Sequence, residues 1–204
     1  TKFIYIYPEF ISYISLSSPN LNTPFGVTSY VRLGLPLYWG LKHLDKCLYL
    51  DTDVLVYKDL SEIYNQNVDN VDVLGFQDIA SKSSYIVSGV LLYNLDRLRK
   101  STRTESGICM FNTHHHRNPD QDIINLHYER KAFDSKFGYC TSKSVEPFPE
   151  DPVLRHFYCW KEIKPTEDGG FRVYKPWEHE EHEHRAEWMY HNSEANKIIA
   201  TNFI

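Results

Sequence analysis

The sequence predicts an α/β fold with a mixed, mostly parallel sheet. Short runs rich in Val, Ile, Leu and Tyr alternate along the chain with segments that carry helix caps and helix-forming residues. Carboxylates follow one of these runs directly, at the strand end where open α/β sheets bind their ligands. The 204 residues show no repeat and no linker composition. We therefore expect a single domain over residues 1–204.

The first half of the chain supplies most of the predicted strands. Pro8 ends the first of them, and turn residues fill the stretch up to Gly26. Thr28 and Ser29 are suited to cap the first helix. Strands are predicted at residues 3–7, 47–51, 71–76 and 86–95, and helical segments at 28–33, 37–43, 59–64 and from 96.

The second half begins with a polar loop at 112–119 and a helix at 120–126, whose first turn is acidic, as the helix dipole favours. Residues 134–153 are rich in Pro and Ser and predict irregular structure. A strand is expected at 154–160, and the turn signal Asp168-Gly169-Gly170 indicates a hairpin within 160–175. Residues 178–204 are expected to form a helical tail, with a helix that closes at 188–190.

Asp51-Thr52-Asp53 is the most informative stretch, because it interrupts an apolar run. Two carboxylates are costly to bury as ions without a partner, and a divalent cation suits two hard oxygen ligands. Strand alternation would place Asp51 and Asp53 on one face. A solvated, inert turn is the simpler interpretation of an isolated Asp-x-Asp, but it does not require the apolar flanks seen here.

The net charge, the length of the apolar stretches and the cysteine spacing exclude several classes of function. The net charge of -5 argues against non-specific nucleic-acid binding. No apolar stretch approaches the roughly 20 residues that span a bilayer, so we expect no transmembrane segment and leave peripheral membrane association open. None of the four cysteines forms a C-x-x-C pair, which argues against a zinc ribbon and favours a reduced, cytoplasmic setting.

Five blocks of the chain together resemble glycosyltransferase family 8, which includes glycogenin and bacterial lipopolysaccharide galactosyl- and glucosyltransferases. Each block alone is weak, but they occur in the family's order with similar spacing. They are Tyr30-x-Arg32-Leu33, Leu48 to Val56, Ser88-Gly89-Val90-Leu91-Leu92-x-Asn94-Leu95, Asp120-Gln121-Asp122-Ile123-Ile124-Asn125 and His156-Phe157.

The resemblance implies a GT-A fold and a retaining transfer of glucose or galactose from a UDP-sugar donor to a glycan or other hydroxyl acceptor. It assigns Asp51, Asp53 and His156 to Mn²⁺, with Mg²⁺ as the alternative ion. Donor-binding residues carried over are Arg32, Asp51, Thr52, Asp53, Ser88, Gly89 and Lys175. Asp120 and Gln121 match the family's catalytic pair, where one residue stabilises an oxocarbenium-like centre or acts as nucleophile.

The chain departs from the family pattern in three places. Val87 stands where the family usually has Asn. Lys-Pro occurs twice, at Lys164 and at Lys175, and we prefer Lys175 because Trp177 completes Lys-Pro-Trp. The family's first strand and uracil-binding residues would lie upstream of residue 1, so we expect an N-terminally incomplete domain.

Two alternative functions stay open at this point. One is a truncated or degenerate transferase domain that serves as a binding or assembly module, which Val87 and the missing first strand favour. The other is a haloacid-dehalogenase-type phosphatase with Asp51 as nucleophile. That class gives no reason for Asp120-Gln121-Asp122 or His156, and Glu150-Asp151-Pro152 is a poor candidate for its later acidic pair.

Overall fold

The chain forms two compact units in a computed structural model. The structure describes residues 13–21, 26–78, 84–140, 150–157, 163–165, 171–173, 175, 177–178 and 184–202. The first unit combines Thr1–Leu50 with Ser61–Asp134, and the second combines Asp51–Leu60 with Ser135–Ile204. The expectation of one catalytic domain stays a prediction.

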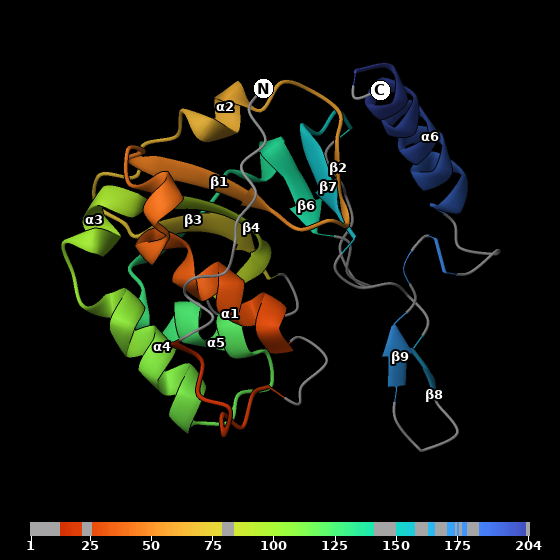
Figure 1. Cartoon of the computed structure of the whole chain (residues 1–204). Helices are drawn as coiled ribbons and strands as arrows, with labels where there is room; N and C mark the ends of the chain where they lie inside the picture. The colour runs from red at the N-terminus through yellow and green to blue at the C-terminus, as the bar shows by residue number, and fades with distance from the viewer. Residues whose placement is uncertain are drawn as a thin grey trace. The chain divides into compact units, whose positions relative to one another are not determined.

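A four-stranded sheet forms the centre of the first unit (Figure 1). Its strands are β1 (Lys46–Leu50), β3 (Val73–Gln77), β4 (Ile86–Asn94) and β5 (Arg130–Ala132), in the order β1-β4-β3-β5. β4 pairs antiparallel with both β1 and β3, and β5 pairs parallel with β3. The α/β class with a mixed sheet is therefore confirmed.

The expectation of a mostly parallel sheet is wrong for the described strands. Antiparallel pairs are the more numerous, and they also join β2 to β7 and β8 to β9 in the second unit. The connection from β3 to β4 explains the difference in the first unit. It spans only residues 78–85, which is too short for the crossover of a dozen or more residues that parallel neighbours need.

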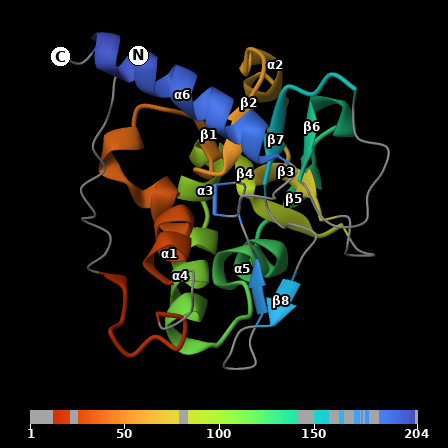
Figure 2. The same cartoon turned by 90° about the vertical axis from the view of Figure 1, so that its right-hand side faces the viewer.

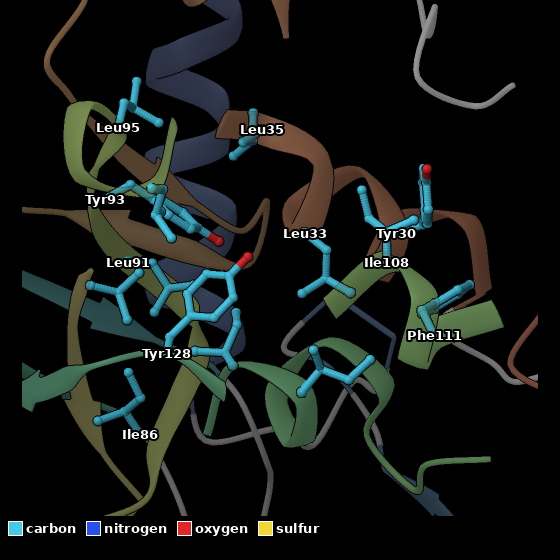
Figure 3. Close-up of a cluster of buried hydrophobic side chains, with 14 of the residues drawn as sticks. Tyr30, Leu33, Leu35, Ile86, Leu91, Tyr93, Leu95, Ile108, Phe111 and Tyr128 are labelled. Atoms are coloured by element: carbon cyan, nitrogen blue, oxygen red, sulfur yellow. The ribbon is translucent and has the colours of Figure 1, made fainter. Parts of the chain in front are cut away.

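Three helices cover this sheet and pack on one another (Figure 2). They are α1 (Gly26–Gly34), α4 (Arg103–Thr113) and α5 (Pro119–His127). Tyr30 and Leu33 of α1 point into the same cluster as Phe111 of α4 and Leu91 and Tyr93 of β4 (Figure 3). Full burial of one such aliphatic or Phe side chain contributes about 1.5–3 kcal/mol, so this cluster fixes the helices on the sheet.

The shorter helices of the first unit are η2 (Leu35–Leu37), η3 (Trp39–Leu41), α2 (Ser61–Tyr64) and α3 (Leu95–Arg99). The helix expected over 37–43 is therefore two 3-10 turns. Pro36 stands within η2, and Tyr38 between the two turns has an extended backbone, which interrupts an α-helix. Asn94 caps α3, because its side-chain oxygen accepts a hydrogen bond from the N–H of Arg97 at 2.9 Å.

A buried carboxylate ties several elements of the first unit together. Asp72, which precedes β3, is fully buried. It accepts hydrogen bonds from Arg97 Nε at 2.9 Å, Arg103 Nη1 at 3.2 Å and the N–H of Glu129 at 2.7 Å. These donors come from α3, from α4 and from the residue before β5, so one charge holds three segments against β3.

The second unit contains a small sheet in the order β2-β7-β6, a hairpin and the last helix. β2 (Val54–Val56) pairs antiparallel with β7 (Leu154–His156), and β6 (Gly138–Cys140) pairs parallel with β7. A 3-10 turn, η4 (Ser135–Phe137), precedes β6. The predicted hairpin within 160–175 is confirmed as β8 (Ile163–Pro165) and β9 (Phe171–Val173).

The last helix, α6 (Arg185–Asn202), continues beyond the predicted end at 188–190. Glu187 anchors it to β7, because its carboxylate accepts hydrogen bonds from Arg155 Nη1 at 2.8 Å and Tyr57 Oη at 2.6 Å. Trp188 packs edge-on against Phe157. The expected strand at 3–7 and the distal part of the strand expected at 154–160 lie outside the described residues. None of the helices described is both long and apolar enough for a membrane crossing.

Candidate functional site

The second unit begins with the Asp-x-Asp, which forms a turn rather than continuing the strand. Asp51 follows β1 directly, and its carbonyl accepts a hydrogen bond from the N–H of Val54 at 3.3 Å. β2 then starts at Val54, which lies opposite His156 in β7. The N–H of Phe157 donates to the carbonyl of Asp53 at 2.9 Å. The sheet pairing thus brings His156 next to the turn.

Asp51, Asp53 and His156 lie together, as the sequence predicts. His156 Nε2 is 3.2 Å from Asp53 Oδ1 and 3.8 Å from Asp51 Oδ2. Each residue offers one ligand atom, and all three atoms lie within 4.8 Å of one another. Asp53 and His156 are buried, whereas Thr52 is exposed in the turn. This arrangement is compact enough for one ion.

Lys175 also reaches this group. Its Nζ donates a hydrogen bond to Oδ2 of Asp53 and another, of 2.8 Å, to the carbonyl of Phe157. Lys175 therefore lies beside the predicted metal ligands, as the preference for the second Lys-Pro requires. The side chain of Lys164 lies outside the part of the chain whose side chains are described.

The pKa of Asp53 reflects these neighbours. Burial alone would raise it, but the hydrogen bond and charge of His156 and the charge and hydrogen bond of Lys175 outweigh burial. The pKa therefore lies well below its usual range, and Asp53 is an anion at neutral pH. Two carboxylates and one imidazole form an oxygen and nitrogen donor set that can hold a divalent cation, so the residues present fit a divalent metal ion.

A second polar cluster lies in the first unit, around Arg32 of α1. Arg32 is buried and forms an ion pair with Asp120 of α5, which is buried as well. Its Nη1 also donates to Ser88 Oγ at 2.7 Å, and its Nη2 donates to Tyr49 Oη at 3.0 Å. The guanidinium lies 4.8 Å from the centre of the Tyr49 ring. Arg32 is therefore a buried residue that organises this cluster, not a surface charge.

Gln121 faces the same strand as Ser88. Its Oε1 accepts a hydrogen bond from the N–H of Ser88 at 3.0 Å. Its Nε2 is buried and has no hydrogen-bond partner among the described residues. A buried amide donor without a partner is costly, so Nε2 is available to a ligand oxygen. Gly89, next in β4, is buried too.

Sequence reasoning missed two residues of this cluster. Tyr49 supplies the acceptor for Nη2 of Arg32, and Asn125 contacts Gln121 and β4. The signal for Asn125 was its place one helical turn after Gln121. Asp122 lies in the acidic first turn of α5, where it accepts hydrogen bonds from the N–H of Asn118 at 3.0 Å and from Tyr85 Oη.

Curated relatives of the chain are mostly glycosyltransferases. A putative glycosyltransferase of Haemophilus influenzae is 27% identical over 135 residues, which cover 58% of this chain and 37% of the relative. Glycosyltransferase GlyA of Streptococcus pneumoniae is 26% identical over 169 residues, which cover 76% of this chain and 23% of GlyA. The chain thus spans well under half the length of these relatives.

Solved structures of glycosyltransferases share the fold. The galactosyltransferase LgtC, in complex with donor and acceptor sugar analogs, gives a TM-score of 0.54 at 22% identity, over 82% of this chain and 69% of LgtC. The bifunctional glycosyltransferase WbbM gives 0.62 at 16% identity, over 83% of this chain and 36% of WbbM. GlyE of Streptococcus pneumoniae gives 0.52 at 19% identity, over 70% of this chain and 40% of GlyE. At these identities the likeness shows the fold, which is GT-A.

The family comparison covers most of the chain. The family described as "Glycosyl transferase family 8" matches residues 1–180. This range includes both polar clusters and all five sequence blocks, and the match removes the reason to consider a phosphatase. The chain belongs to glycosyl transferase family 8.

Proposed function

We propose that the chain transfers a hexose, glucose or galactose, from a UDP-sugar to the hydroxyl group of a glycan or other acceptor, with retention at the anomeric carbon. Family membership supports glycosyl transfer. The observation that carries the proposal is the group formed by Asp51, Asp53 and His156 with the ammonium of Lys175 beside it. Such a group is suited to a metal-bound diphosphate.

The residues of the second unit would hold the donor diphosphate. Asp51, Asp53 and His156 would bind Mn²⁺, or Mg²⁺ in its place, and the ion would neutralise the negative charge that develops on the departing UDP. Lys175 Nζ, which donates to Asp53 and to the carbonyl of Phe157, would donate to a diphosphate oxygen. Thr52 belongs to the same turn and is exposed to a ligand.

The residues of the first unit would act on the donor sugar. Arg32 Nη1 holds the Asp120 carboxylate through their ion pair and donates a second hydrogen bond to Ser88 Oγ. Gln121 Nε2 is a buried donor suited to a sugar hydroxyl or the ring oxygen. Asp120 or Gln121 would stabilise the positive charge on the reacting carbon, or one of them would act as the nucleophile. Gly89, which has no side chain, would let the donor sugar approach β4 beside Ser88.

The test is an assay of UDP-glucose and UDP-galactose turnover with Mn²⁺, together with direct Mn²⁺ titration followed by electron paramagnetic resonance. EDTA should abolish turnover, and Mn²⁺ should restore it best. Asp53→Asn should lower Mn²⁺ affinity at least about 100-fold, because it removes a charged ligand. Its turnover should fall at least about 100-fold.

Asp151→Asn is the matched control, because Asp151 pairs with Lys58 on the surface of the same unit. It should bind Mn²⁺ and turn over as the wild type does. No turnover by the wild type with either donor would reject the transferase proposal in favour of a non-catalytic binding or assembly module. Equal turnover with and without EDTA would reject the metal assignment alone.

A further inference from the structure

One edge of β4 is only partly covered by a neighbouring strand. β1 pairs with the stretch from Val90 to Asn94 and ends at Leu50, opposite Val90. β4 itself begins four residues earlier, at Ile86. No described strand pairs with Ile86 or Ser88 on the β1 side. Their buried main-chain groups therefore need other partners.

Side chains of α5 supply these partners. Asn125 Oδ1 accepts a hydrogen bond from the N–H of Ile86 at 2.8 Å, and Asn125 Nδ2 donates to the carbonyl of Ile86 at 2.8 Å. Gln121 Oε1 accepts from the N–H of Ser88 at 3.0 Å. Two amide side chains thus continue the hydrogen bonding where β1 stops.

The spacing of the two elements makes this pairing regular. Residues four apart on a helix are separated by about 6.0 Å along its axis. Residues two apart on an antiparallel strand are separated by about 6.8 Å. Gln121 and Asn125 on α5 therefore match Ser88 and Ile86 on β4. A shift of α5 by one residue would break all three bonds.

Asn125 has no spare donor in this arrangement. Its Nδ2 also donates to the carbonyl of Gln121 at 2.8 Å, so both amide hydrogens are used. The side chain is buried. It contacts the strand and the Gln121 main chain at once, whereas Gln121 keeps Nε2 for a ligand.

We propose that Asn125 is a positioning residue of the sugar-facing cluster. It sets the register of α5 on β4, and this register places Asp120 against Arg32 and Gln121 against Ser88. This role rests on the proposed function, since it matters for turnover only if Asp120 and Gln121 act on the donor sugar. Asn125 itself does not touch the substrate.

The test compares Asn125→Ala with Asn112→Ala. Asn112 on α4 makes the same kind of paired contact with main chain: Oδ1 accepts from the N–H of Ser15 at 3.0 Å, and Nδ2 donates to the carbonyl of Tyr13 at 2.9 Å. It therefore controls for the loss of two hydrogen bonds. Asn125→Asp is the second variant, because it keeps the shape and the acceptor for Ile86 and loses both donated bonds.

The readouts are kcat, the Kd of UDP with Mn²⁺, and amide hydrogen exchange of β4. Asn125→Ala should lower kcat about 100-fold, the usual cost of a shift near 1 Å in catalytic groups. The Kd of UDP with Mn²⁺ should change less than twofold, because Asp51, Asp53, His156 and Lys175 are untouched. The amides of Ile86 and Ser88 should exchange at least about tenfold faster. The kcat and the exchange rates of Asn125→Asp should lie between those of Asn125→Ala and the wild type. Asn112→Ala should match the wild type in kcat, in the Kd of UDP and in amide exchange.

Different results separate the two proposals. A wild type that turns over neither donor would overturn both. If the wild type is active and Asn125→Ala and Asn112→Ala have equal kcat, the positioning role alone is overturned. Unchanged amide exchange at Ile86 and Ser88 in Asn125→Ala would overturn it as well. If Asn125→Ala does not fold, Asn125→Asp decides: wild-type kcat in that variant would also overturn the role.

Discussion

Asp72 shows how a single side chain can hold several segments. Its carboxylate is fully buried, whereas Arg97 and Arg103 keep about a third of their side-chain surface exposed. The two arginines thus remain partly hydrated while the anion depends on them and on the N–H of Glu129. Removal of the anion therefore costs more than the loss of a surface ion pair.

Asp72→Asn should lower the free energy of unfolding by about 3 kcal/mol, the lower end of the range for a broken buried pair, because both arginines reach water. The new amide group would also present hydrogens to Arg97, Arg103 or the Glu129 N–H, which are donors themselves. Urea unfolding followed by circular dichroism measures the change.

Asp96→Asn is the control for Asp72→Asn. Asp96 pairs with Lys100 on the exposed face of α3, and such a pair contributes about 0.3–0.5 kcal/mol. A loss of similar size in the two variants would show that Asp72 behaves as an ordinary surface charge.

At this scale the sequence revealed the residues that carry charge and missed those that support them. Asp51 and Asp53 were predictable because carboxylates within an apolar run need a partner, whereas His156 followed from the resemblance to glycosyltransferase family 8. The Lys-Pro-Trp context favours Lys175, which lies beside Asp53. Tyr49 was not predictable, because only the folded chain brings the Arg32 side chain near it. For Asn125 the helical spacing from Gln121 was a signal, but its partner Ile86 at the edge of β4 was not visible in the sequence.

β6 is the element whose pairing leaves the least room for a side chain. Gly138 begins β6 with φ +156°, and a Cβ added there would lie 2.2 Å from the carbonyl oxygen of Leu154 in β7. That obstacle is main chain in a parallel pair, which cannot rotate away as a side chain can. Only glycine fits this approach.

Gly138→Ala should lower the free energy of unfolding by about 3 kcal/mol, because the cost of backbone strain is added to the cost of a clash with main chain. Since β7 carries His156, the Mn²⁺ affinity should fall as well. Thermal unfolding and Mn²⁺ titration together measure both effects.

Gly107→Ala is the control for this change. Gly107 lies inside α4, where an added Cβ would meet the Ile123 Cγ2 methyl at 3.1 Å and the Tyr128 ring at an ordinary 3.8 Å. The higher helix propensity of Ala, about 1 kcal/mol, offsets that contact. The variant should stay within about 1 kcal/mol of the wild type. Unchanged stability and Mn²⁺ affinity in Gly138→Ala would contradict the argument for β6.

The elements that the sequence missed share a physical cause. β5 and β6 have three residues each and gain their order from pairing with distant strands. α4 begins without a side-chain cap, and Ile108 and Phe111 hold it through the core shared with α1 and α5. The longer strand β4 and helix α5 follow their apolar pattern and their acidic first turn, so these were predictable.

For the whole molecule, buried tyrosines set the limit of stability at high pH. Burial raises the pKa of Tyr30 to about 12, and Tyr13 adds to the rise. Burial also raises the pKa of Tyr93 and Tyr128. An unfolded chain exposes these rings, whose pKa then returns to about 10.

Stability should therefore be unaffected by these groups below pH 10 and should fall as the pH rises from 10 toward 12. In that window the unfolded chain loses protons that the folded chain keeps. Tyr30 alone contributes up to about 1.4 kcal/mol per pH unit. Urea unfolding at several pH values, with absorbance at 295 nm to follow tyrosinate, measures the decline.

Tyr30→Phe keeps the packed ring and removes one titrating group. Its stability should decline less steeply between pH 10 and 12 than that of the wild type. Curves of equal slope for the two proteins would show that Tyr30 ionises alike in the folded and unfolded chains.

The hairpin β8–β9 has a consequence for how relatives of this chain are recognised. Ile163 pairs with Val173 and Pro165 with Phe171, so the two ends of the hairpin lie together whatever the length of its turn. Insertions in the turn can therefore increase the number of residues between His156 and Lys175, while Lys175 still reaches Asp53. A search pattern with a fixed interval between the histidine and Lys-Pro would overlook such chains, whereas a pattern with a variable interval would retain them.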